Sequence, residues 1–343
     1  MPKTKVTNAL ERALFDVLIE KELLLDKEKR KLTRNFKKHW GSFDPDALKH
    51  ALQEGGEQER LFALFALGYL MYEEVKELLV PFLSSPVSKE QWASVIVLGE
   101  QKEERAFALL GQLLTEGMEY HSLAVDEKEV MNSVFQAYTQ AREQFGTPKA
   151  WERLVSPDLV QIWNKMQAYR DEYMWYMKHR ERIIRILGAW NDSRAIPILR
   201  QALQTCWQIE QHPTPQGGIL PEYLRESFHQ LEDTLAYTLG QLEAWDALDG
   251  LDTAGLPPSR FKLARMFLVF GSLQVNLQQM SHGNLKMLIA LGAIDPNRVI
   301  NVLQERFGLN EYLARANLQV FQEWYQERDE YWQWQRRIVR GEI

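Results

Sequence analysis

A glycine-containing step between two apolar segments recurs along the chain, and its clearest copy is Leu187-Gly188-Ala189-Trp190-Asn191-Asp192-Ser193-Arg194-Ala195-Ile196-Pro197-Ile198-Leu199. An apolar residue and a glycine close the first segment, a short polar turn follows, and an apolar segment resumes after it. Further strong copies of the apolar-glycine step lie at Leu67-Gly68, Leu98-Gly99, Leu239-Gly240 and Leu291-Gly292, and weaker ones at Phe145-Gly146 and Phe270-Gly271.

The glycines of these copies recur at two preferred distances. An interval of 31 residues separates Gly68 from Gly99 and Gly240 from Gly271, and an interval of 52 residues separates Gly188 from Gly240 and Gly240 from Gly292. The spacing between Gly99 and Gly188 is less regular, so the sequence leaves the number of repeats open.

Each copy is interpreted as a helix, a turn and a second helix that folds back on the first. Glycine is expected to end the first helix because it enters the left-handed region at little cost, and its missing side chain lets the next backbone approach closely. The second helix needs a neighbouring pair to bury its apolar face, so the pairs are expected to stack into a rod. The predicted fold class is therefore all-α, with stacked helix pairs forming a solenoid.

Helical spacing extends through most of the chain, and no alternating strand pattern is found. Ser156-Pro157 offers an N-cap followed by proline at the first helical position, which predicts the longest helix from there towards Leu187. Asp44-Pro45 and Asp295-Pro296 mark further helix starts. Residues 211–218 and 252–258 are predicted to be loops because prolines and glycines interrupt both.

The repeated step resembles the HEAT-repeat family, and most closely the short repeats of phycobilisome-lyase-like proteins. The resemblance is best over residues 187–199 and covers roughly residues 60 to 308. It implies a right-handed α-solenoid, an α-α superhelix of HEAT-like helix pairs. Residues 1–55 are then expected to form an N-terminal helical cap, residues 56–308 the repeat array and residues 309–343 a C-terminal capping helix, all within one continuous solenoid.

The composition indicates a globular protein. The 343 residues carry a formal net charge of −6, which opposes the basic field that general phosphate binding requires. No apolar run approaches the roughly 20 residues that span a bilayer. Cys206 is the single cysteine, which excludes an intramolecular disulfide and, together with the polar start of the chain, favours a reducing, cytoplasmic location.

No catalytic, cofactor or metal motif stands out, so no cofactor and no metal are expected. The seven histidines are widely separated and form no i, i+4 pair. HEAT-like deoxyhypusine hydroxylases, which the predicted architecture resembles, hold iron through His-Glu dipeptides, and no histidine here precedes a glutamate. Cys206 is expected to be a buried structural thiol. An enzymatic function is left open as the less favoured interpretation.

Aromatic residues gather on the predicted long helix and on the last helix of the chain. On the long helix they cover more than one stripe, so they are either core or the lining of a groove for a peptide. On the last helix they form either a cap on the final repeat or a docking surface beside arginines. The candidate partner-binding residues are Tyr169, Tyr173, Trp175, Tyr176, Arg180, Trp324 and Trp334.

A basic run near the N-terminus is a second candidate surface. It is either a contact for nucleic acid, an acidic partner or an anionic membrane surface, or the solvated face of a capping helix. Its members are Lys27, Lys29, Arg30, Lys31, Arg34, Lys37 and Lys38.

The leading hypothesis is a non-catalytic scaffold or adaptor that binds a protein or peptide partner on its concave face. The resemblance implies one alternative, a phycobilisome-lyase-like enzyme or chromophore chaperone. It implies a second, a HEAT-like DNA-binding protein of the alkylpurine glycosylase type, in which Trp175 and Arg180 or Arg182 would hold damaged DNA. The acidic net charge opposes nucleic-acid binding, which stays open only through the basic run. The oligomeric state is left open.

Overall fold

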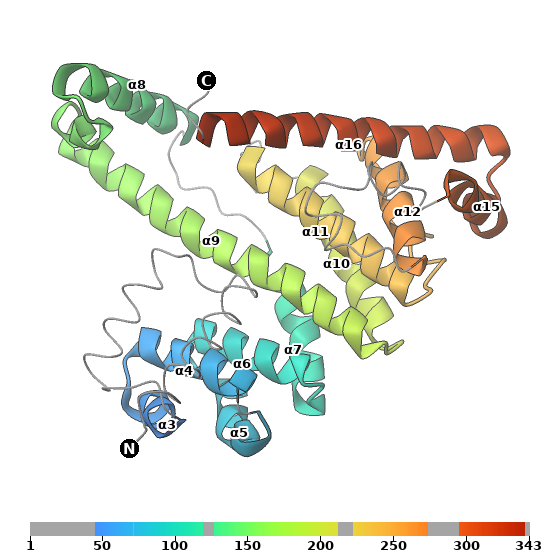
Figure 1. Ribbon diagram of the computed structural model, residues 1–343, viewed down its shortest axis with the longest axis horizontal. Coiled ribbons are helices and arrows are strands. Elements are labelled where there is room, and N and C mark those ends of the chain that lie inside the picture. Colours follow the sequence, from blue (N-terminus) through green and yellow to red (C-terminus); the bar gives the residue numbers. More distant parts are fainter. Residues whose placement is uncertain (1–44, 71, 119–126, 212–221, 274–294, 340–343) are drawn as a thin grey trace, which may run out of the picture. The chain divides into compact units, whose positions relative to one another are not determined.

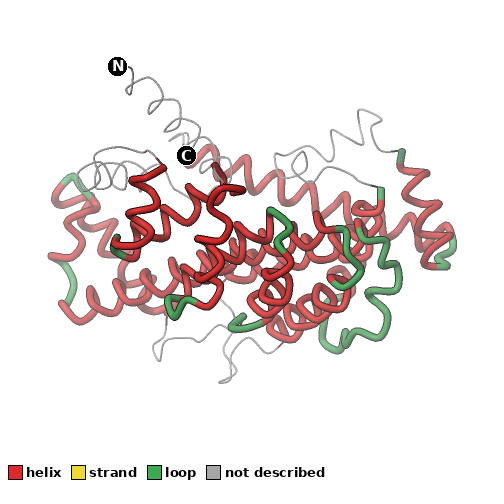
Figure 2. Tube along the Cα trace, turned by 90° about the horizontal axis from the view of Figure 1, so that it is seen from below, coloured by secondary structure: helices red, strands yellow, loops and turns green. Residues whose placement is uncertain are grey.

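A computed structural model describes residues 45–70, 72–118, 127–211, 222–273 and 295–339. Every regular element in these ranges is a helix, and none is a strand (Figure 1 and Figure 2). The predicted all-α class is confirmed over this part of the chain.

The chain divides into two compact units, Met1–Leu114 and Thr115–Ile343. The expected division into an N-terminal cap, an array and a C-terminal cap stays a prediction. The first unit contains α3 (Pro45–Glu54), α4 (Glu57–Leu70), α5 (Tyr72–Leu79), the 3-10 helix η1 (Val80–Ser84), α6 (Ser88–Glu100) and α7 (Glu104–Thr115), whose final residue opens the second unit.

The second unit is larger. It contains α8 (Glu127–Phe145), the 3-10 helix η2 (Pro148–Arg153), α9 (Pro157–Trp190), α10 (Ala195–Gln211), α11 (Glu222–Gln241), α12 (Pro258–Ser272), α15 (Pro296–Phe307) and α16 (Glu311–Val339). Its centre is α11, which packs against α9, α10 and α12. Residues 231–240 of α11 are all buried, because the helix is surrounded on its successive faces.

The predicted helix starts agree with the structure. The Ser156 hydroxyl accepts a hydrogen bond from the Leu159 N–H at 3.3 Å, and α9 begins at Pro157. The Asp295 carboxylate accepts one from the Asn297 N–H at 2.8 Å, and α15 begins at Pro296. Each cap satisfies one of the amide donors that the first helical turn leaves without a partner.

The expectation that the repeated glycines end their helices is confirmed at Gly146, which follows α8 with φ of 69°, and is wrong at three of the strong copies. Gly99, Gly188 and Gly240 lie inside the last turn of α6, α9 and α11. The left-handed conformation falls three residues later, on Lys102, Asn191 and Glu243, with φ of 57°, 54° and 56°.

Each of these left-handed residues closes the helix in the same way. Its N–H donates a 3.0 Å hydrogen bond to the carbonyl of the glycine three residues earlier, in the pairs Lys102–Gly99, Asn191–Gly188 and Glu243–Gly240. The backbone repeat is therefore a helix ending with a fixed offset between a glycine and its cap. The cap leads into α7 after Lys102 and into α10 after Asn191.

The physical reason for glycine is helix packing. A Cβ on Gly240 would lie 1.9 Å from the Leu268 carbonyl oxygen of α12, and a Cβ on Gly271 would lie 1.9 Å from the Tyr237 carbonyl oxygen of α11. The two helices thus touch backbone to backbone at two glycines 31 residues apart. Gly68 of α4 also packs closely on α6, but against a side chain, since a Cβ there would lie 1.9 Å from Cγ1 of Val97.

The copy at Leu239-Gly240 lacks the second helix of the pair. After Glu243 the chain makes turns over residues 245–250, and residues 251–257 are not helical, which confirms the predicted loop as far as Pro257. Gln204 of α10 fixes this segment through two hydrogen bonds with the backbone of Asp252, at 2.7 and 3.2 Å. The predicted loop at 211–218 lies outside the described residues from position 212 onwards.

We predict that Gly240→Ala destabilises the second unit, because its Cβ would meet the Leu268 backbone, which cannot move aside without separating the helices. The free energy of unfolding should fall by about 3 kcal/mol in chemical denaturation, at the upper end of overpacking costs. Gly188→Ala is the matched control, since its Cβ meets the Thr238 side chain at 2.6 Å instead of backbone. An equal loss in both variants would contradict this account.

Glu103, which follows the Lys102 cap, is held by two cations in the first unit. Its carboxylate pairs with Lys76, and it accepts a 2.8 Å hydrogen bond from Nε of Arg105. Arg105 also bonds the exposed Glu77 at 2.8 Å. The hydrogen bonds from Arg105 and Lys76 lower the pKa of Glu103 from 4.5 to about 2.

We predict that Glu103 contributes stability that is lost on acidification. Because its pKa is lower in the folded chain, the contribution is present above about pH 4.5 and disappears as the pH falls towards 2. The stability of Glu103→Gln should therefore fall less steeply than that of the unmodified chain across this window, in urea titrations at several pH values. The control is Glu73→Gln, which removes an exposed carboxylate from α5. Parallel pH profiles for Glu103→Gln and the unmodified chain would refute the role.

Candidate interaction site on helix α9

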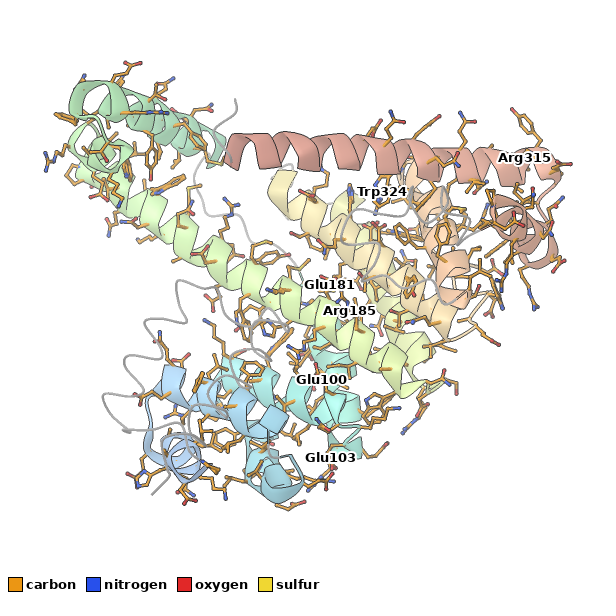
Figure 3. All side chains as sticks on the ribbon, in the orientation of Figure 1. Glu100, Glu103, Glu181, Arg185, Arg315 and Trp324 are labelled. Atoms are coloured by element: carbon orange, nitrogen blue, oxygen red, sulfur yellow. The ribbon has the colours of Figure 1, made fainter. Side chains whose placement is uncertain are left out.

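Helix α9 spans 34 residues and changes its surroundings along its length. Its beginning packs with α8 and η2 around a small core that includes Val134, Ala141 and Trp151. Its end packs against α11, where Gln230 donates a 3.3 Å hydrogen bond to Glu181. Glu181 also pairs at 2.5 Å with Arg185, one turn further along α9 (Figure 3). The predicted aromatic residues lie on the stretch between these two contacts.

Two of the predicted partner-binding residues are buried, which corrects their assignment to a partner surface. Tyr173 is 6% exposed and donates a 2.7 Å hydrogen bond to the Met118 carbonyl. Arg180 is 2% exposed and donates a 2.5 Å hydrogen bond to the Glu116 carbonyl. Seven residues separate them along α9, so both point from one face and together hold the segment that contains Glu116 and Met118.

Burial also sets the electrostatics of Arg180. Removal of the guanidinium from water lowers its pKa from the ordinary value. The Glu116 carbonyl oxygen and, at 3.9 Å, the Met177 sulfur are among its contacts. A cation placed in this way holds α9 against the neighbouring segment and is not available to a DNA phosphate. The glycosylase-type role suggested for Arg180 therefore loses its basis, whereas the same role for the half-buried Arg182 stays a prediction.

Trp175 and Tyr176 are half-buried and rigidly arranged. The Trp175 ring stacks on His179 with 3.8 Å between ring centroids, and it meets Tyr176 edge to face at 5.0 Å. The Trp175 carbonyl accepts a 2.7 Å hydrogen bond from Nδ1–H of His179. One histidine therefore holds both the backbone and the ring of Trp175.

His179 is a stable support because it stays neutral. Burial lowers its pKa to about 3, and the nearby positive charges of Arg182 and Lys178 act in the same direction. The side chain is 3% exposed. The stack on Trp175 is therefore unchanged by protonation across the physiological range of pH.

Three half-buried rings surround one exposed carboxylate on α9. Tyr169, Trp175 and Tyr176 lie at positions −3, +3 and +4 from Glu172, which are the positions adjacent to it on a helix surface. We call these four residues the α9 aromatic surface. Aromatic faces and a carboxylate together attract a Lys or Arg side chain, through cation–π contact and charge.

The predicted residues of the last helix do not join this surface. Trp324 of α16 (Figure 3) is half-buried and packs edge to face on Phe267 of α12 at 5.5 Å. Phe321, its neighbour on α16, is fully buried and meets Phe270 at 4.9 Å. Trp324 thus helps to attach α16 to α12, as the packed-cap interpretation requires. Trp334 lies on α16, and its side chain is outside the described part.

The predicted basic run, residues 27–38, lies outside the described residues. Within the described ranges, no group of three or more His, Cys, Asp and Glu side chains is placed to hold a metal ion. Cys206 is fully buried on α10, as expected for a structural thiol. Among the helices of the described ranges, none has the length and apolar character needed to cross a membrane.

Sequence reasoning missed a buried charged cluster between α11 and α12. Arg260, 7% exposed, bonds Glu232 through Nη2 at 2.5 Å and through Nε at 3.2 Å. Nη2 also lies 3.5 Å from Asp233. The sequence signal that could have indicated this cluster is the acidic pair Glu232-Asp233, which interrupts the apolar residues of α11. Removal of one partner from such a cluster would leave a buried charge uncompensated, so we assign the cluster to holding the two helices in register.

Comparison with protein families agrees with the repeat found in the sequence. Residues 180–205 match the family model of the PBS lyase HEAT-like repeat. The match covers the end of α9, the Asn191 cap and the first part of α10, and it confirms the expected resemblance to HEAT repeats over these residues. The searches of curated proteins and of solved structures gave no match.

Proposed function

We propose that this chain is a non-catalytic α-solenoid scaffold that binds a protein partner through the α9 aromatic surface. The solenoid arrangement is supported by the HEAT-like repeat at residues 180–205 and by packing between neighbouring helices: α10 on α11, α11 on α12, and α12 on α16. Repeat proteins of this kind use extended surfaces of successive helices to hold their partners.

The observation that carries the proposal is the fixed position of Trp175. Its ring is held by the neutral His179 and by Tyr176, and it is half-buried, not fully buried. Tryptophan and tyrosine are common anchors of protein interfaces. A ring that is already fixed loses little conformational freedom on binding, so more of its contact energy contributes to affinity.

The chemistry of the surface indicates what the partner presents. Glu172 is exposed at the centre of the three rings, so a partner Lys or Arg side chain could pair with its carboxylate while lying against an aromatic face. We therefore expect the partner to insert a basic side chain beside apolar residues. A cation bound in this way is partly shielded from water and adds specificity as well as affinity.

We predict that Trp175→Ala removes the partner from the purified complex. Tagged unmodified chain, Trp175→Ala and Tyr312→Ala should be compared by affinity purification from the native cell, followed by quantitative mass spectrometry. Tyr312 is the control because it is 79% exposed on α16, away from the α9 surface along the chain. Loss of an anchor worth about 2 kcal/mol corresponds to a roughly 30-fold weaker Kd, which calorimetry with the recovered partner would measure.

Glu172→Gln tests the charge of the partner separately. It should weaken binding and reduce its dependence on salt, because the exchanged amide no longer attracts a cation. Circular dichroism should show the same helix content in all variants. Equal recovery of the partner by the unmodified chain and Trp175→Ala would contradict the site. Recovery of the chain with a small molecule and no protein would contradict the scaffold function.

A further inference from the structure

Two polar side chains of α10 hold a non-helical part of the chain by its main chain. Gln204 accepts a 2.7 Å hydrogen bond from the Asp252 N–H through Oε1, and it donates a 3.2 Å one from Nε2 to the Asp252 carbonyl. One turn earlier, Arg200 donates a hydrogen bond from Nη2 to the Asp249 carbonyl. None of these hydrogen bonds involves a side chain of residues 249–252, which are called the strap below.

The paired contact at Asp252 shows which conformation α10 recognises. The N–H and the carbonyl of one residue point to the same side where the backbone is extended, as in a hydrogen-bonded pair of an antiparallel sheet. The side-chain amide of Gln204 offers the same donor and acceptor as a peptide group. Gln204 therefore pairs with Asp252 as a neighbouring strand would. Such pairing is open to any residue except proline, which has no N–H.

The same face of α10 carries a further amide that the strap does not use. Gln208 lies one turn beyond Gln204, is exposed, and makes no hydrogen bond with any residue that the structure describes. Four residues of a helix advance about 6 Å, and two residues of an extended chain advance about 6.6 Å. A chain that continued straight from Asp252 would therefore bring its next peptide groups of the same orientation to Gln208.

The strap turns away before it reaches Gln208. The Asp252 carboxylate accepts a 2.9 Å hydrogen bond from the Ala254 N–H, and the Leu256 N–H donates a 3.0 Å hydrogen bond to the Thr253 carbonyl. Leu256 is buried, so it directs the chain away from α10 and into the core. The chain's own segment thus occupies only the first part of the polar face.

The strap is held loosely between two fixed ends. Leu248 and Leu256 are buried, whereas the residues between them are exposed or half-buried. Gly250 and Gly255 have φ of 70° and 79°, and glycine adopts other backbone angles at little cost. The three hydrogen bonds to α10 are exposed, so each adds little net stability. These features allow the strap to leave α10 while its two ends stay in place.

We propose that Arg200, Gln204 and Gln208 form a row that binds the main chain of an extended segment from a partner protein, and that the strap is an internal occupant of this row. The partner segment is selected by its conformation more than by its side chains. The strap lowers the apparent affinity, because the partner binds only those molecules in which the strap is released. The row lies on a different helix from the α9 aromatic surface, and the proposal does not rest on that surface.

A peptide that copies the strap tests the row on the full chain. The probe has the sequence of residues 247–254 with blocked ends, and it lacks Leu256, so nothing draws its last residues away from α10. Binding is followed by NMR through the side-chain amide signals of Gln204 and Gln208, which are identified by their loss in Gln204→Ala and Gln208→Ala. Both signals should shift as the probe is added at millimolar concentrations.

Release of the strap should raise the affinity of the row. Asp252→Pro removes the N–H that bonds Gln204, so this variant should bind the probe at least about tenfold more tightly than the unmodified chain. A two-glycine insertion after Gly250 should act in the same direction, which covers a failure of the proline variant to fold. Gln204→Ala in the released chain should abolish the gain. Gln140→Ala, which removes an exposed amide from α8, should preserve it.

A second probe, with proline at the position of Asp252, tests recognition of the main chain. It should not bind, because it lacks the N–H that Gln204 accepts. Equal binding of the two probes would overturn the proposal, as would equal binding by Gln204→Ala and Gln140→Ala. If neither released chain responds to the first probe, α10 only holds the connection and the proposal is wrong. Trp175→Ala should bind the probe like the unmodified chain, so the α9 surface is tested separately.

Discussion

The second unit depends on the backbone contact between α11 and α12. Gly240 and Gly271 bring the two helices so close that a single methyl group on either would collide with a carbonyl oxygen of the other. This contact fixes the position of α11, whose residues 231–240 are buried on all sides. The charged cluster of Arg260, Glu232 and Asp233 lies between the same two helices. The backbone contact and the ion pairs thus fix the register between α11 and α12. Helices α9 and α10 pack on α11.

Much of this arrangement could be predicted from the sequence because glycine spacing and helix caps are local signals. Ser156-Pro157 and Asp295-Pro296 marked helix starts that the structure confirms. The role of Gly99, Gly188 and Gly240 was not predicted correctly, because a residue that packs inside the last turn and one that ends the helix, as Gly146 does, have the same sequence neighbourhood. Asn191 could have indicated the difference, since asparagine is the ordinary substitute for glycine in the left-handed region. Lys102 and Glu243 carry no such signal.

The candidate site was predicted less completely, because exposure depends on the neighbours that the fold supplies. Tyr173 and Tyr176 are three residues apart on one helix, yet Tyr173 is buried beneath the Met118 segment and Tyr176 is half-buried. Periodicity alone could not separate them. It equally missed the support that His179 gives to Trp175, because a lone histidine on an apolar helix indicates no partner. Charges buried by tertiary packing, such as Arg180 and Arg260, could not be located before the packing was known.

Native-state hydrogen exchange tests the central claim most directly, because it measures the free energy with which each helix opens. If the glycine contact holds the second unit together, amides of residues 231–240 and 263–271 should be the slowest to exchange within that unit. They should also open together, with one shared dependence on denaturant. Faster exchange in α11 and α12 than in α9, or independent opening of the two helices, would contradict the account.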